Sequence, residues 1–251
     1  MAELRTAGAL TRISATQRRD FWWLEPALVF VGLGIFIVYA TLRALEGDFY
    51  AWGPYLSPFY SPLIDPQHHW WPYSPALLIL LGPLGFRTTC YYYRKAYYRA
   101  FFWDPPACAV GELRQRYKGE TAFPLILQNI HRYFFYLSFL YLVFLWRDAV
   151  RAFDWQGRFG MGLGTLVLIV NVSLLTTYTL SCHSCRHLVG GNLDCFSCAK
   201  FGGGRLSLWR KVTALNEHHM LIAWMSLFCV GFADLYVRLV SSGAFHDPRF
   251  F

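Results

Sequence analysis

The chain has 251 residues, of which 55% are hydrophobic and 19% aromatic. Only 15% are charged, against about 25% in an average soluble domain, which excludes an ordinary water-soluble fold and an intrinsically disordered chain. The net charge of +8 lies in loops between apolar runs and not along one polar face, so we expect no nucleic-acid partner.

Five apolar runs follow one another along the chain. A hydrocarbon core about 30 Å thick takes roughly 20 helical residues to cross. The runs are Pro26–Leu42, Tyr73–Phe86, Tyr133–Trp146, Phe159–Ser181 and Met220–Val237. The second run is short and contains two prolines, and the third is expected to begin earlier, near residue 123. We therefore predict an all-α fold, a polytopic transmembrane helical bundle of about five spans.

Lysine and arginine are distributed unequally between the two predicted sides of the membrane. With the N-terminus inside, the inner segments 1–25, 87–132 and 182–219 contain 17 of the 23 basic residues, whereas the outer loop 47–72 contains none. Basic loops stay on the cytoplasmic side. The sequence thus predicts a cytoplasmic N-terminal segment 1–25 and a membrane-anchor domain 26–251 in the plasma membrane. The basic loops fit contact with anionic lipid or with an acidic partner protein.

Six potential metal ligands lie within residues 182–198, directly after the fourth run, in a stretch predicted to be cytoplasmic. They are Cys182, His183, Cys185, His187, Cys195 and Cys198. The spacing C-x2-C-x9-C-x2-C can wrap one tetrahedral metal ion, because each C-x2-C turn points two thiolates at a common centre. Gly190 and Gly191 let the chain reverse between the two halves.

Three interpretations of this segment compete. A structural zinc knuckle needs only the four cysteines and leaves both histidines idle. A Rieske-type iron–sulfur cluster uses two cysteines and two histidines. Reduced thiols without a metal are the third.

The histidine positions bear on the choice. If the fourth helix continues past residue 181, His183 and His187 share one face. Cys185-x-His187 then matches half of the Rieske pattern, but Cys198 stands where the other half requires histidine. The second imidazole would come from His183 or from another helix, with Cys90 as a reserve thiolate. The candidates elsewhere on the same predicted side are His131, His218 and His219.

Two places offer a flat apolar slot with donors for the carbonyls of a quinone. At the predicted inner surface the donors are Tyr92, Arg94 and Tyr98. At the predicted outer surface they are His69, Trp70 and Tyr73. An interfacial aromatic belt is the alternative for the outer set. Proximity to the cysteine and histidine segment favours the inner set.

Three stretches of the chain resemble a known family. They are Cys90–Arg99 (CYYYRKAYYR), Asp104–Cys108 (DPPAC) and Ser181–Gly191 (SCHSCRHLVGG). Together they resemble the membrane-anchor subunit of the actinobacterial, mycobacterial-type succinate dehydrogenase, and the resemblance extends over nearly the whole chain. It implies a three-subunit enzyme in which an FAD-containing flavoprotein oxidises succinate and an iron–sulfur protein with further clusters relays the electrons. The anchor passes them to a membrane quinone, menaquinone or ubiquinone, and is not catalytic alone.

The resemblance also implies a Rieske-type [2Fe–2S] centre in place of haem. We expect its ligands among the six residues of the segment: Cys182, His183, His187 and Cys195, with Cys185 and Cys198 as alternatives. A G-x-G-x-x-G motif, the fingerprint of dinucleotide binding, does not occur in the chain, so flavin chemistry is expected in a partner subunit. The alternatives are a haem-carrying anchor and a zinc-knuckle membrane scaffold without electron transfer.

Overall fold

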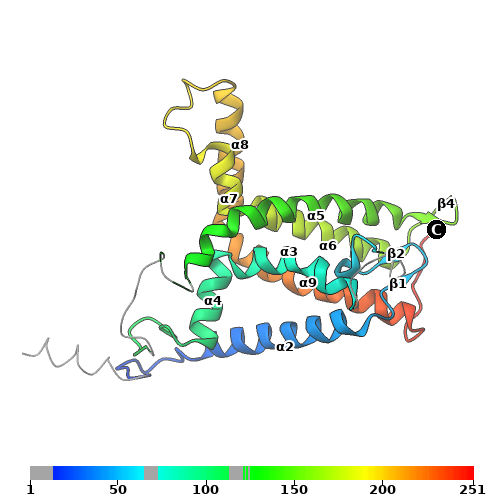
Figure 1. The fold of residues 1–251 in the computed structure, drawn as a ribbon, viewed down its shortest axis with the longest axis horizontal. Coiled ribbons are helices and arrows are strands. Elements are labelled where there is room, and N and C mark those ends of the chain that lie inside the picture. The colour runs from blue at the N-terminus through cyan, green and yellow to red at the C-terminus, as the bar shows by residue number, and fades with distance from the viewer. Residues whose placement is uncertain (1–13, 65–72, 113–120, 122, 124) are drawn as a thin grey trace, which may run out of the picture. The chain divides into compact units, whose positions relative to one another are not determined.

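The computed structural model describes residues 14–64, 73–112, 121, 123 and 125–251, and within them the chain is all-α, as predicted (Figure 1). Its helices are α2 (Leu24–Glu46), α3 (Pro75–Thr88), α4 (Tyr91–Phe101), α5 (His131–Arg151), α6 (Leu163–Leu180), α7 (His183–Arg186), α8 (Gly202–Glu217) and α9 (His219–Ser241). Shorter helical turns are η1 (Pro58–Tyr60), η2 (Leu125–Ile130) and the π-helix η3 (His187–Gly191). Two small antiparallel hairpins pair β1 (Ala51–Trp52) with β2 (Tyr55–Leu56) and β3 (Asp154–Trp155) with β4 (Arg158–Phe159).

Four helical segments of the described chain are long and apolar enough to cross a membrane. They are Leu24–Glu46, Ile126–Arg151, Leu163–Leu180 and His219–Ser241. The run expected as the second span forms α3, which has 14 residues and contains Pro83. At 1.5 Å per residue, α3 is about 21 Å long, shorter than a straight crossing of a core about 30 Å thick. The multi-pass character is thus confirmed, with four helices of spanning length and one shorter apolar helix.

The chain divides into two compact units. The first contains Met1–Tyr39 and Arg87–His131, and the second contains Ala40–Phe86 and Arg132–Phe251. The first unit therefore holds most of α2 together with α4. The second holds the helices α5 to α9 and the cysteine and histidine segment.

The core of the second unit forms where α6 packs against α9, its most extensive helix contact. Gly164 in the first turn of α6 permits this core to include an aromatic ring, because a Cβ there would lie 2.4 Å from the ring of Tyr55. Burying such apolar side chains stabilises the unit by about 25 cal/mol for each Å² removed from solvent. The fully enclosed residues are Tyr55, Ala149, Ala152, Leu168, Val172 and Val237.

A charged network is buried inside the second unit, near the C-terminal end of α9. Arg238 donates from Nε to Asp234 Oδ2 at 2.8 Å, and the two side chains are 6% and 0% exposed. Arg238 also donates to Glu46 Oε2 at 2.9 Å and to the carbonyl of Asp48 at 2.6 Å. Ser57 donates its hydroxyl to Asp234. Asp234 is the only acid in the apolar run Met220–Val237, and it is both ion-paired and hydrogen-bonded, as the burial of a charge requires.

The C-terminal tail returns to the start of α6. The Asp247 carboxylate accepts hydrogen bonds from the backbone N–H of Gly164 at 2.8 Å and from the hydroxyls of Tyr55 and Tyr236 at 2.9 and 2.5 Å. A carboxylate at a helix N-terminus satisfies a backbone donor and interacts favourably with the helix dipole. Asp247 thus fastens the tail to the end of the bundle opposite the cysteine and histidine segment.

Candidate metal centre and quinone site

The cysteine and histidine segment begins where α6 ends. The sequence-based possibility that this helix continues past Ser181 is wrong, because α6 stops at Leu180 and a new helix, α7, starts at His183. Cys182 is the N-cap of α7, with extended backbone, and its Sγ accepts the N–H of Ser184 at 3.4 Å. The break turns Cys182 inward, and its side chain is buried.

The first four predicted ligands lie on this short helix and the π-turn after it. Cys182 and Cys185 are both buried, and desolvation raises the pKa of the Cys185 thiol. His183 lies at the surface, where the surrounding protein still removes part of its water. This desolvation lowers the pKa of His183, and the nearby Arg186 guanidinium and the His187 ring lower it further. A neutral imidazole and a thiolate are the forms that bind metals, so His183 is suited to binding and Cys185 needs a metal to release its proton.

Unlike His183, His187 forms a hydrogen bond with an arginine side chain. Its Nδ1 lies 2.9 Å from a guanidinium nitrogen of Arg132, which can only donate. Nδ1 is therefore the acceptor, and the proton of the neutral ring sits on Nε2. A metal-binding histidine ordinarily donates its second ring N–H to an acceptor, which arginine is not. His187 would have to leave Arg132 in order to bind a metal in the usual way.

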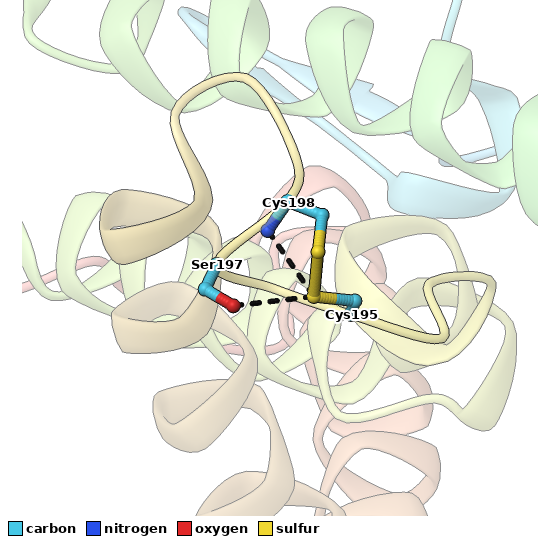
Figure 2. The surroundings of a disulfide bond; sticks show 3 residues. All are labelled: Cys195, Ser197 and Cys198. Carbon is cyan, nitrogen blue, oxygen red and sulfur yellow. Dashed lines mark hydrogen bonds between the residues drawn. A yellow bond between two sulfur atoms is a disulfide. The ribbon is translucent and has the colours of Figure 1, made fainter.

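The second half of the predicted ligand set does not join the first. Figure 2 shows that Cys195 and Cys198 are bonded to each other in a disulfide. The N–H of Cys198 donates to Cys195 Sγ at 3.2 Å, and the hydroxyl of Ser197 lies at the same distance from that sulfur. Over the described ranges, no three His, Cys, Asp or Glu side chains are grouped so as to hold a metal ion. The donor types fit an iron–sulfur centre, but the six residues as placed do not form one.

A buried histidine adjoins Cys182. His219, the first residue of α9, is 1% exposed, and its Nδ1 lies 2.6 Å from the hydroxyl of Ser181. The imidazole stacks on the ring of Tyr178, with centroids 5.1 Å apart and planes 13° apart. Asn216 donates to the carbonyl of Ser181 at 2.7 Å and closes the cluster. The sequence placed His219 only among several helix-borne candidates, because its burial depends on the packing of α6 against α9.

In the first unit, the reserve thiol Cys90 is buried at the N-terminus of α4, as its N-cap. The neighbouring Thr89 hydroxyl lies 2.9 Å from Nδ1 of His131. A buried thiol and a hydrogen-bonded imidazole thus occur together in this unit as well.

The inner quinone candidates lie on α4, all partly exposed. Arg94 and Tyr98 are four residues apart and share one face, whereas Tyr92 is two residues from Arg94 and lies on another. The guanidinium of Arg94 stacks over the ring of Tyr91 at 4.8 Å. Tyr98 contacts the ring of Phe102, with centroids 5.4 Å apart.

Of the outer quinone candidates, Tyr73 is exposed. His69 and Trp70 lie outside the described residues.

Comparisons with known proteins agree with the sequence resemblance. The family model of the actinobacterial succinate dehydrogenase subunit SdhC matches residues 24–243. Among solved structures, the chain is similar to a chain of the Mycobacterium smegmatis Sdh1 complex in the apo form. The two are 45% identical, the match covers 94% of each chain, and the TM-score is 0.84. A search of the curated proteins gives no match.

Proposed function

Because the chain belongs to the family of the actinobacterial succinate dehydrogenase subunit SdhC, we propose that it passes electrons from the iron–sulfur partner subunit to a membrane quinone. It is a membrane subunit of an oxidoreductase complex, and its partners are other succinate dehydrogenase subunits. The single observation that carries the proposal is the family match over residues 24–243. In the overall reaction, succinate gives up two electrons and two protons to become fumarate, and quinone takes up two of each to become quinol.

The relay within this chain is proposed to be a Rieske-type [2Fe–2S] centre, which when bound would carry one electron at a time towards the quinone. Cys182 and His183 support it best: the first is a buried thiol at a helix start, and the second has a neutral imidazole. His187 and Cys195 complete the proposed set, with Cys185 and Cys198 as alternatives, and Cys195 or Cys198 would bind only once their mutual bond is reduced.

For the quinone we propose the inner site. Arg94 and Tyr98 on one face of α4 offer a cationic and a phenolic donor, which would bind the carbonyls and orient the ring. Tyr92 belongs to the same proposed set, although it lies on a different face of α4 from Arg94 and Tyr98. His69, Trp70 and Tyr73 are the proposed outer alternative.

The proposed topology places the N-terminal segment 1–25 and the cysteine and histidine segment 182–198 in the cytoplasm. The membrane-anchor domain 26–251, which includes the second of these segments, then crosses the plasma membrane, and α3 has to cross it together with the four helices of spanning length. The excess of lysine and arginine in segments 1–25, 87–132 and 182–219 supports this orientation. A relay at the cytoplasmic end would lie beside a partner subunit on that side.

The function is tested by separating the two halves of the reaction in the purified complex. We expect the double variant His183→Ala/His187→Ala to lose quinone reduction while it keeps succinate oxidation with an artificial electron acceptor. His246→Ala, on the C-terminal tail beside Asp247, is the matched control and should retain both. Quinone reduction at the wild-type rate in the double variant would exclude these histidines as relay ligands.

Metal analysis of the same complex distinguishes the other cofactors. One zinc ion per complex, with no cluster assignable to this chain, would favour the zinc knuckle. A sharp Soret band would favour haem.

A further inference from the structure

Helix α8 stands out from the end of the second unit. Figure 1 shows it directed away from the ends of α5 and α6, and only His218 separates it from the spanning helix α9. One face is fixed to α7: the guanidinium of Arg186 lies 4.9 Å from the ring centre of Trp209, and its Nε donates to Thr213 at 3.0 Å. Val212 on this face is buried. The helix therefore has a defined orientation about its own axis.

An apolar stripe follows another side of α8. Leu208 and Leu215 are spaced by seven residues, which places them in one line along the helix, and Phe201 is the N-cap at its start. Phe201 is 88% exposed and Leu208 is 50% exposed, and Leu215 is partly exposed. The stripe leads towards α9, whose first turn exposes Met220 and Leu221.

One cation borders this stripe. Lys211 is three residues from Leu208 and four from Leu215, so its side chain lies next to both. Arg210 is two residues from Leu208 and therefore lies on the opposite side of the helix, and both cations are exposed. Neither has a hydrogen bond or an ion pair with any residue that the structure describes.

We propose that α8 is an interfacial membrane anchor, which inserts Phe201 and Leu208 among the lipids of one leaflet and binds anionic phospholipid headgroups through Lys211. Exposed apolar side chains next to basic ones are typical of helices that lie in the headgroup region. The helix joins a spanning helix through one residue, so its end is held at the bilayer surface. The anchor does not depend on a relay centre or on the place where quinone binds.

Photo-crosslinking in the intact complex tests this anchor. The complex is placed in nanodiscs of equal parts phosphatidylglycerol and phosphatidylcholine, with benzoylphenylalanine at position 208. We expect lipid adducts that are enriched in phosphatidylglycerol. The same probe at position 217, which is exposed and nine residues from position 208, lies on the opposite side of the helix and should give few lipid adducts.

The contribution of the cations is measured by the adduct ratio. Lys211→Gln should lower the phosphatidylglycerol enrichment about fivefold, as expected for one basic residue near an anionic surface. Arg210→Gln, on the opposite side of the helix, should leave it nearly unchanged. Arg158→Gln, in the hairpin before α6, is the control and should leave the ratio unchanged. Adducts with a partner subunit at position 208, or equal capture of both lipids, would overturn the proposal.

Discussion

The buried pair of Asp234 and Arg238 gives the most quantitative prediction. Replacing Arg238 with leucine removes the cation that donates to Asp234, whose side chain is 0% exposed. Breaking a buried pair on one side costs about 3–5 kcal/mol, because the remaining charge stays in a low-dielectric environment. We therefore expect Arg238→Leu to lower the free energy of unfolding by about 3–5 kcal/mol.

Two matched variants isolate the cause. Glu46 also accepts from Arg238, but its side chain is 32% exposed, so Glu46→Gln should cost only about 0.2–1 kcal/mol. The double variant Asp234→Leu/Arg238→Leu removes both buried charges and should cost less than Arg238→Leu, because no charge is left uncompensated. It still costs some stability, since two backbone carbonyls lose a donor and the Ser57 hydroxyl loses its acceptor.

Denaturant titration in mixed micelles, followed by circular dichroism, measures all three free energies of unfolding. If Arg238→Leu costs no more than Glu46→Gln, the pair is not buried as described. If the double variant is no more stable than Arg238→Leu, the cost does not come from the uncompensated carboxylate.

Three further predictions concern the tail and the cysteine and histidine segment. Asp247→Ala removes the acceptor of two tyrosine hydroxyls and a helix N–H, and should lower the free energy of unfolding by about 2–4 kcal/mol. Tyr236→Phe removes one of these bonds and should lower it by about 1–2 kcal/mol, so equal losses in the two variants would refute the shared acceptor. The lowered pKa of His183 keeps its imidazole neutral in more acidic solution. The rate at which diethyl pyrocarbonate modifies His183 should therefore rise with pH around a midpoint below about pH 6.5, and a midpoint above that pH would contradict the desolvation. Burial and a raised pKa protect the Cys185 thiol, so iodoacetamide at neutral pH should alkylate the exposed Cys108 first. If peptide mass spectrometry shows Cys185 alkylated before Cys108, the buried position of Cys185 is wrong.

The spanning helices could be predicted from the sequence because hydrophobicity is a local signal. The charge-free run that became α6 ends within a residue of the helix itself. The bounds of α3 were harder to judge, since the apolar run ends at Phe86, before the charged Arg87, whereas the helix continues to Thr88.

The candidate site was only partly predictable. Sequence spacing predicts Cys182 and His183 as ligands, but it could not reveal that Cys195 bonds to Cys198 and not to the first pair. The burial of His219 against Tyr178 depends on two helices distant in the sequence, and no local pattern encodes that contact.

The central proposal is an iron–sulfur relay held by this chain, and electron paramagnetic resonance of the succinate-reduced complex tests it most directly. The account predicts a mixed cysteine and histidine [2Fe–2S] signal that disappears in Cys182→Ser, while the signals of the partner subunit persist. An unchanged spectrum in Cys182→Ser, or a wild-type complex that reduces quinone without any such signal, would contradict it.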